Sequence, residues 1–231
     1  MSKLLVIVPA YNEQASIKKV VQDIKSANTD YDIIVVDDRS TDGTRAILEN
    51  ENICHLSLPI NLGIGGAMQT GYKYAKENGY DFAVQVDGDG QHEPREIVKL
   101  LKVQQETGAD LVIGSRFIND SKEYKQTVLR KLGIEIFAFC TKILANQKIF
   151  DATSGFRLAN RNIINMYADY YPSDYPEPEV IVMIKKRGYK IHEVPTKMNL
   201  RETGKSSITP LRSVYYMIKV ISSMLLQKVR D

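Results

Sequence analysis

The sequence predicts an α/β fold in which helices cover both faces of a mostly parallel β-sheet. Short runs rich in Val, Ile and Leu, typical of strands buried on both faces, alternate with segments of helical periodicity. The chain has 231 residues, 43% of them hydrophobic and 26% charged, as in a globular protein with one large core. Because strand-helix-strand connections are almost always right-handed, this alternation predicts helices on both sides of one sheet.

The predicted elements of the first half follow one another regularly, up to about residue 116. Five apolar runs are expected to be strands: Lys3 to Val8, Asp32 to Val36, Ile53 to Leu58, Phe82 to Val86 and Leu111 to Ile113. An apolar face, a capping residue or a leading proline predicts the helices between them: Ile17 to Ile24, a turn capped by Ser40 and Thr41 that runs to Leu48, Ala67 to Lys76, and Pro94 to Gly108.

The pattern changes after Arg116. The expected elements are a helix from Leu129 to Leu144, a short strand from Gly155 to Leu158, a helix from Val180 to Lys186 ended by Gly188, and a strand from Lys190 to Val194. A cluster of aromatic and proline residues predicts an irregular surface loop: Tyr170, Tyr171, Pro172, Tyr175, Pro176 and Pro178. Since no linker or repeat appears, we expect the second half to extend the same sheet.

Charge and cysteine content exclude several classes of protein. The net charge is only +3 and the basic residues form no run, so nucleic acid is not an expected partner. Cys54 and Cys140 lie far apart, which argues against a disulfide framework or a zinc site and favours a reducing, cytoplasmic compartment. The apolar run Leu4 to Val8 is too short for a signal peptide, and Val214 to Leu226 is too short and too interrupted to span a bilayer.

The strongest chemical signal is Asp87-Gly88-Asp89, directly after a predicted buried strand. Two carboxylates two residues apart can share one hard divalent cation, whose open positions then accept phosphate oxygens. The alternative is an ordinary turn, in which Asp and Gly are common. An EF-hand is excluded by His92 and Val98, which stand where glycine and glutamate are required. Met68 replaces the third glycine of a dinucleotide fingerprint and argues against a nicotinamide cofactor.

Two further polar groups follow the first two predicted strands. Pro9 to Glu13 follows the first strand and Asp37-Asp38 ends the second. Like charges on one rim repel one another, so a cation and a polar ligand would relieve the cost of bringing them together. For Asp38, capping of the following helix is the alternative.

Several segments, in order, carry a family resemblance: Val8-Pro9-Ala10-Tyr11-Asn12-Glu13, Val35-Val36-Asp37-Asp38-Arg39-Ser40-Thr41-Asp42-Gly43-Thr44, Asn61-Leu62-Gly63 and Asp87-Gly88-Asp89-Gly90-Gln91. They resemble the signature of glycosyltransferase family two. Gly114-Ser115-Arg116 and Ser154-Gly155-Phe156-Arg157 are similar to its dolichyl-phosphate-mannose-synthase-like branch. The resemblance extends to about Ser207. It implies a GT-A, Rossmann-like fold and transfer of a sugar, with inversion, from a nucleotide-diphosphate donor, UDP-linked in preference to GDP-linked.

The resemblance also implies site residues. Nucleotide-binding residues would be Pro9, Tyr11, Glu13, Asp37, Asp38 and Asp87. A Mg or Mn ion would be held by Asp87, Asp89 and Gln91. Phosphate or acceptor contacts would come from Arg116, Arg157, Arg201 and Lys205, for which solvated surface charge is the alternative. Glu177 stands where the catalytic base of the family often lies, with Glu179 and Asp151 in reserve; the alternative for the glutamates is stabilisation of a helix N-terminus.

The sequence is compatible with two kinds of acceptor, a sugar hydroxyl and a lipid phosphate. A lipid phosphate is already ionised and needs no base, whereas a sugar hydroxyl does. The two glutamates of Tyr175 to Glu179 therefore favour a hydroxyl acceptor in a cell-surface polysaccharide or glycolipid, with a polyprenyl phosphate as the alternative. A sugar-phosphate nucleotidyltransferase is a second alternative, although Pro9 to Glu13 replaces the glycine-rich basic loop it requires. A non-catalytic nucleotide-sugar-binding subunit is a third.

The predicted organisation is one glycosyltransferase domain over residues 1–207, with a nucleotide-binding half (1–116) and an acceptor half (117–207). An amphipathic helix over 208–231 follows, with Leu211, Val214, Ile218, Ile221 and Leu225 on one face. This helix can dock on its own domain, form a homo-oligomer interface, or lie at the inner face of the membrane. A fringe of basic residues suits anionic lipid: Lys205, Arg212, Lys219, Lys228 and Arg230.

Overall fold

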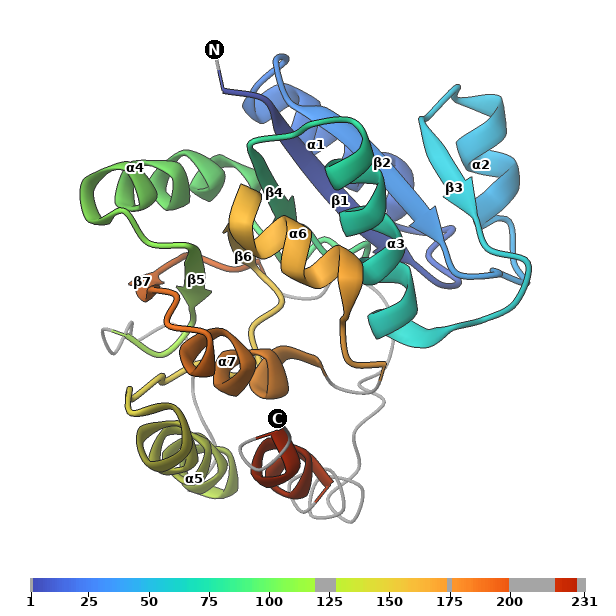
Figure 1. Ribbon diagram of the computed structural model, residues 1–231. Coiled ribbons are helices and arrows are strands. Elements are labelled where there is room, and N and C mark those ends of the chain that lie inside the picture. Colours follow the sequence, from blue (N-terminus) through green and yellow to red (C-terminus); the bar gives the residue numbers. More distant parts are fainter. Residues whose placement is uncertain (1, 119–127, 174–175, 200–218, 228–231) are drawn as a thin grey trace.

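The structure is a computed structural model that describes residues 2–118, 128–173, 176–199 and 219–227. Its strands form one seven-stranded sheet in the order β3-β2-β1-β4-β6-β5-β7 (Figure 1). They are β1 (Leu4–Ala10), β2 (Asp32–Asp37), β3 (His55–Ser57), β4 (Phe82–Gln85), β5 (Leu111–Ser115), β6 (Arg157–Asn160) and β7 (Ile191–Pro195). Only β6, among these described strands, runs antiparallel to its neighbours, β4 and β5. The predicted mostly parallel sheet, extended by the second half of the chain, is confirmed.

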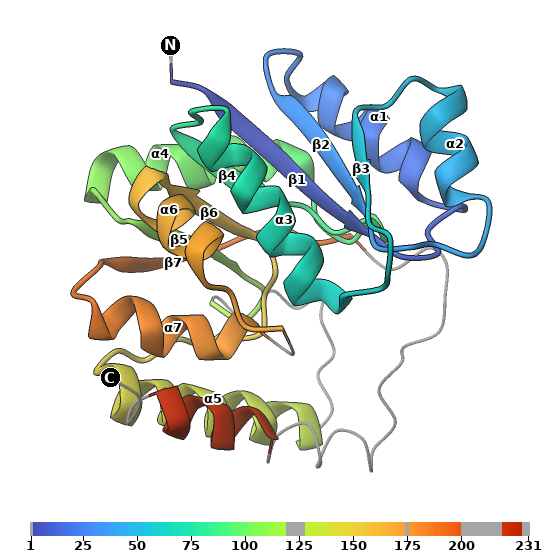
Figure 2. The same cartoon turned by 45° about the vertical axis from the view of Figure 1, so that its right-hand side comes forward.

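Helices cover both faces of the sheet (Figure 2). One face carries α1 (Ile17–Ala27), α2 (Thr44–Asn50) and α4 (Ile97–Thr107), the last preceded by a 3-10 turn, η1 (Pro94–Glu96). The other face carries α3 (Gly63–Glu77), α6 (Arg161–Asp169) and α7 (Pro176–Lys186). Outside α7 lie α5 (Val128–Ala145) and the helical residues 219–227, side by side in both views.

Alternation within the strands separates the two cores. In β1, Leu5 and Ile7 join the core beneath α3, whereas Leu4, Val6 and Val8 join the core beneath α1. All of these side chains are buried. Successive side chains of a strand point to opposite faces, so a strand between two helical layers must be apolar throughout, as this run is.

Helix α6 was not predicted. Asn160 caps its N-terminus, because the Asn160 side chain accepts the N–H of Ile163 at 3.1 Å. Its buried positions Ile163, Ile164, Tyr167 and Ala168 have helical spacing.

The expected start of α7 at Val180 was also wrong, because Pro176 and Pro178 lie in its first turn. Proline is tolerated there because N–H groups of the first turn have no partner within the helix. Gly188, with φ 80°, follows the end of the helix, as expected.

The described part of the C-terminal helix buries only part of the predicted apolar surface. Val220, Met224 and Gln227 are buried and Ile221 packs against the core, whereas Leu225, from the predicted face, is 49% exposed. The spacing of the buried residues is i, i+4, i+7, one face of a helix. Leu211, Val214 and Ile218 lie outside the described residues.

Candidate active site

A cleft of about 240 Å³ opens at the carboxyl ends of the central strands. It is lined by the loops that follow β1, β2 and β4 and by the start of α3: Pro9, Ala10, Tyr11, Glu13, Asp38, Ile64, Ala67, Asp87, Gly88 and Asp89. The topology explains this convergence, since β1 lies between β2 and β4 and all three run in the same direction. Most of the side chains expected to bind nucleotide and metal therefore meet in one place.

Reciprocal hydrogen bonds tie the loop after β1 to the loop after β2. The Asn12 main-chain N–H donates to Ser40 Oγ at 3.0 Å, and the Thr41 N–H donates to Asn12 Oδ1 at 2.8 Å. Asn12 has φ 58°, in the left-handed region that non-glycine residues seldom occupy. The prediction that Ser40 and Thr41 cap the next helix was wrong: α2 begins at Thr44, and both residues bind Asn12 of the loop after β1 instead.

The two adjacent aspartates that end β2 have different surroundings. Asp37 is buried, and its carboxylate accepts the Ser40 N–H at 3.0 Å and the Ser57 hydroxyl at 3.4 Å. Asp38 lines the cleft and accepts the Leu62 N–H at 2.7 Å, immediately before α3. Asp37 thus supports the loop from inside, whereas Asp38 faces the space that a ligand would fill.

The loop after β4 holds both carboxylates of the predicted metal motif. Asp87 Oδ1 accepts from Gln85 Nε2 at 2.8 Å, and Asp89 Oδ1 accepts the Gln91 N–H at 3.1 Å. Sequence reasoning missed His92, whose Nδ1 accepts the Asp87 N–H at 3.0 Å and whose buried ring lies 5.1 Å from that of Phe156. This contact fixes the ring proton on Nε2, which lies 3.5 Å from Asp87 Oδ2.

The donor set of this loop fits a divalent metal only in combination with a ligand. Within residues 2–118, 128–173, 176–199 and 219–227, no group of three or more His, Cys, Asp or Glu side chains could hold an ion. Asp87 and Asp89 nevertheless both line the cleft. Two carboxylates are a usual protein contribution to a magnesium site whose other ligands are water and phosphate oxygens.

Glu177 lies half-buried in the first turn of α7. Burial raises the pKa of its carboxyl, the nearby charge of Asp87 raises it further, and the charges of Arg157 and Arg116 oppose that rise. Three buried tyrosines, Tyr72, Tyr167 and Tyr171, lie within range of its charge and pack edge-on or tilted. This tyrosine cluster was not foreseen as part of the site, and burial of a carboxyl favours its neutral form.

Arg157 does not lie where the sequence placed it. The side chain is only 1% exposed, and its guanidinium donates to the carbonyl oxygens of Ser154, Ala152 and Glu177 at 2.7 to 2.8 Å. Neither the expected phosphate contact nor a solvated surface position fits this geometry. Arg157 instead fixes the turn before β6 to the first turn of α7.

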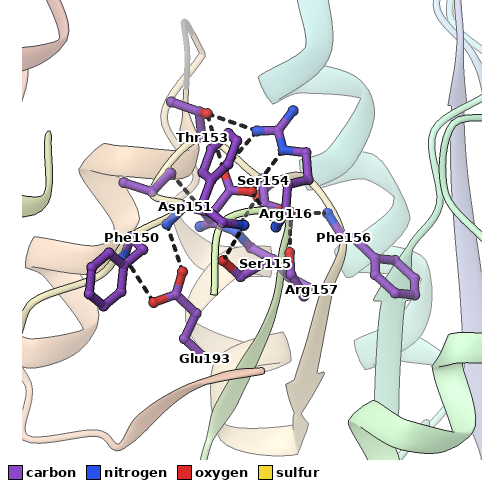
Figure 3. Close-up of polar contacts among 12 residues, drawn as sticks. Ser115, Arg116, Phe150, Asp151, Thr153, Ser154, Phe156, Arg157 and Glu193 are labelled. Atoms are coloured by element: carbon purple, nitrogen blue, oxygen red, sulfur yellow. Dashed lines mark hydrogen bonds and ion pairs between the residues drawn. The ribbon is translucent and has the colours of Figure 1, made fainter. Parts of the chain in front are cut away.

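The remaining candidates lie in two other places. Asp151 is buried and its carboxylate accepts from Arg116 (Figure 3). Glu179 Oε1 accepts from Gln227 Nε2 at 2.6 Å, which directs it toward the C-terminal helix. Arg201 and Lys205 lie outside the described residues.

A family model described as "Glycosyl transferase family 2" matches residues 5–167. The chain belongs to this family. With its sheet order and its cleft at the strand ends, this family-2 glycosyltransferase has the predicted GT-A fold. None of its described helices is long and apolar enough to cross a membrane.

Relatives of this glycosyltransferase match nearly its whole length. A Methanococcus voltae protein named UDP-N-acetylglucosamine–dolichyl-phosphate N-acetylglucosaminyltransferase is 33% identical over 84% of this chain and 84% of its own. A Micrococcus luteus protein named undecaprenyl-phosphate mannosyltransferase is 29% identical over 90% and 88%. Glucosyl-3-phosphoglycerate synthase of Mycobacterium tuberculosis, crystallised with Mn²⁺ and UDP, shares the fold, with a TM-score of 0.74 at 20% identity over 100% of this chain and 81% of that one.

Proposed function

We propose that this enzyme moves a sugar, with inversion at the anomeric carbon, from a UDP-sugar to a polyprenyl phosphate. The observation that carries the donor side is the single cleft that joins Asp38 and Tyr11 to the Asp87–Asp89 pair. The acceptor assignment is supported by the named activities of the relatives from Methanococcus voltae and Micrococcus luteus, which match nearly the whole chain.

The wall formed by the loops after β1 and β2 suits the nucleoside. Tyr11 is 50% exposed at the cleft and offers a ring face on which a base can stack. Asp38 offers a carboxylate acceptor to an N–H of the base or a ribose hydroxyl. Pro9 and Glu13 also line this wall of the cleft, and Asp37 supports it through the hydrogen bond that it accepts from the Ser40 N–H.

The loop after β4 suits the diphosphate. Asp87 and Asp89, with Gln91 on the same turn, would hold Mg or Mn. When bound, the ion would neutralise charge that develops on the departing nucleoside diphosphate. The chain's own contribution is to hold the Asp87 carboxylate through Gln85, the Asp87 main chain through His92 and the Asp89 carboxylate through the Gln91 N–H.

A second candidate acceptor is a sugar hydroxyl, for which Glu177 would act as the base. Its raised pKa brings the carboxyl closer to the neutral range, where a general base is most effective. With a hydroxyl acceptor, Glu177→Gln should lower kcat by about 10² to 10⁴ and remove the acidic limb of the pH profile. With a phosphate acceptor, the same variant should retain most of its activity, because the nucleophile arrives ionised.

Incubation with a panel of sugar donors tests the proposed sugar transfer. The protein is incubated with Mn²⁺, undecaprenyl phosphate and, in turn, UDP-glucose, UDP-N-acetylglucosamine and GDP-mannose, and the products are separated. We expect nucleoside diphosphate and a glycosyl phospholipid from a UDP-sugar. Release of pyrophosphate would indicate a nucleotidyltransferase, and tight binding without turnover a non-catalytic subunit.

The proposed acceptor requires contact with lipid. We propose that the protein is cytoplasmic and that it attaches to the inner face of the membrane through α5 and the C-terminal helix. Their outer surfaces expose Phe139, Ile143, Leu225 and Leu226. Apolar side chains gathered on two neighbouring helices can insert at a membrane surface.

A further inference from the structure

The main chain and the guanidinium of Arg116 both bond to one buried carboxylate, that of Asp151 (Figure 3). Asp151 Oδ2 accepts both the Arg116 main-chain N–H at 2.9 Å and its Nε–H at 2.7 Å, and Asp151 Oδ1 accepts its Nη2–H at 2.7 Å. The Asp151 side chain is 0% exposed, against 21% for that of Arg116. A single carboxylate therefore sets both the backbone and the guanidinium plane of Arg116, which follows β5.

A second carboxylate holds the first. On β7, Glu193 Oε1 accepts the Asp151 N–H at 2.6 Å and Oε2 accepts the Phe150 N–H at 2.9 Å. Strand register places Glu193 opposite Ile113 of β5, and the Ser115 hydroxyl also bonds to it. Burial raises the pKa of this carboxyl, while its hydrogen bonds oppose the rise. Burial of a carboxylate costs solvation free energy. A carboxylate at this position therefore indicates a role beyond packing.

The turn that holds Arg116 is also joined to the first turn of α7. Thr153 Oγ1 accepts from Arg116 at 3.1 Å. Arg157 donates both to the Ala152 carbonyl of this turn and to the Glu177 carbonyl, at 2.8 Å each. The charge of Arg116 accordingly opposes the rise in the pKa of Glu177. Asp151 faces Arg116 with both oxygens, and this arrangement suits support of a cation better than uptake of a proton from an acceptor.

We propose that Asp151 and Glu193 are positioning residues that orient Arg116 toward the phosphate of the acceptor. This inference rests on the proposed function, because a phosphate acceptor gives Arg116 its anion. Neither carboxylate contacts the substrate. Glu193 fixes Asp151, and Asp151 fixes Arg116.

The test compares Glu193→Gln with a matched control at the other end of the same strands. Asp110 precedes β5 and accepts the Lys190 N–H at 2.9 Å and the Asn160 side chain at 2.8 Å, as Glu193 does for residues 150 and 151. Asp110→Asn therefore likewise removes a carboxylate that bridges two segments, without affecting Arg116. If Glu193→Gln does not fold, Glu193→Asp, which keeps the charge and withdraws it by one methylene, takes its place.

The kinetic readout is KM for undecaprenyl phosphate with the best donor of the panel, beside the Kd of Mn²⁺·UDP. Glu193→Gln should raise that KM about tenfold to a hundredfold, with Kd unchanged. Asp110→Asn should change neither. In an Arg116→Lys background, Glu193→Gln should cause no further loss, because both changes act through one group. A wild-type KM in Glu193→Gln, or losses that multiply in the double variant, would overturn the proposal.

A spectroscopic readout keeps this inference separate from the proposed function. The Arg116 Nε–H, bonded to a buried carboxylate, should give an exchange-protected ¹⁵N signal that is identified by its loss in Arg116→Lys. Glu193→Gln should shift or broaden it, and Asp110→Asn should not. An unchanged signal in Glu193→Gln refutes the positioning role. If the signal changes but no donor yields a glycosyl phospholipid, the proposed function fails and the positioning of Arg116 stands.

Discussion

Asp87 and Asp89 are two residues apart in the chain and are supported differently. Asp87 contacts Gln85 of β4 and His92 at the end of its own loop, whereas Asp89 accepts the N–H of Gln91 within its own turn. Loss of Asp87 therefore removes a structural partner as well as a candidate metal ligand. Asp89 is the cleaner position at which to test metal binding.

We expect Asp89→Ala to lower kcat by about 10² to 10³ with little change in unfolding free energy. The reason is the loss of a charge-assisted contact to an ion that acts mainly in the transition state. Turnover with Mn²⁺ and calorimetric Mn²⁺·UDP affinity measure the effect. Asp30→Ala, in an ordinary surface turn, is the control. A wild-type kcat in Asp89→Ala would contradict the proposed metal site.

Glu177 links activity to stability through its pKa. Because burial raises the pKa in the folded state, the folded protein binds more protons than the unfolded chain over the interval above the ordinary carboxyl range. Stability contributed by this group is present below the ordinary pKa and is lost as pH rises through the raised one. At neutral pH the ionised carboxyl is therefore a destabilising feature.

Glu177→Gln should accordingly equal or exceed the wild type in unfolding free energy at about pH 7.5, and the difference should shrink toward about pH 4. Urea unfolding at both values measures it. A variant less stable at pH 7.5 than at pH 4, relative to wild type, would contradict the assigned direction of the pKa shift.

At the scale of the elements, strands were easier to predict than the contacts of the polar residues between them. An apolar run such as that of the first strand admits few other structures: a strand was predicted from Lys3 to Val8, and β1 runs over Leu4–Ala10. The aspartates at the strand ends were located for the same reason. Helix α6 was missed even though its buried residues have helical spacing, because the short apolar pattern follows a strand without a break.

The unforeseen parts of the site depend on tertiary contacts. Arg157 was expected at a phosphate, but its guanidinium donates to the nearby carbonyls of Ala152 and Ser154 and to that of Glu177, twenty residues further on, and only the folded chain brings these three acceptors together. His92 reaches Asp87 through a turn whose geometry depends on Gly90, with φ 75°. The roles of the predicted site residues stay predictions until the variants are measured.

Gly65 controls how α3 meets the segment that leads to α7. A Cβ at this position would lie 2.1 Å from the Pro172 carbonyl oxygen and 2.4 Å from that of Ser173. The Gly65 N–H donates to that Ser173 oxygen at 3.2 Å. This close approach joins one wall of the cleft, at Ile64 and Ala67, to the chain that enters α7.

Gly65→Ala should therefore destabilise the protein by about 1 to 3 kcal/mol, despite the better helix propensity of alanine, because the backbone contact must open. Lys73→Ala, on the exposed side of α3, is the control and should be neutral within about 0.5 kcal/mol. Urea unfolding compares the two. Equal stabilities would show that residues 172 and 173 can move aside without cost.

At the scale of the whole molecule, apolar exposure is unevenly distributed. Phe139 and Ile143, 62% and 59% exposed, lie on α5, outside the layer formed by α7. Val98, 56% exposed, lies on α4, over the opposite face of the sheet. Substitutions on α5 and on α4 can therefore be compared to find which surface binds the membrane.

Replacement of both Phe139 and Ile143 by Ser should reduce binding to phosphatidylglycerol vesicles by about tenfold or more, since each loses apolar area at the lipid. Val98→Ser should bind as the wild type does. Vesicle co-sedimentation measures both. Equal binding by all three proteins would place the membrane contact elsewhere, and unaltered turnover on a short-chain soluble acceptor would confirm that the cleft is intact.

The insertion of β6 between β4 and β5 has a consequence for synthesis on the ribosome. Among the described strands, β5 pairs only with β6 and β7, so it has no hydrogen-bonded neighbour when it first emerges. It must wait, solvated or held by a chaperone, until the chain has been made through Asn160. Strands β1 to β4 can assemble earlier, but β4 then presents an open edge to other nascent chains. A truncated product that ends after β5 would therefore be prone to aggregate, whereas insertion of β6 pairs β4 and β5 in one step.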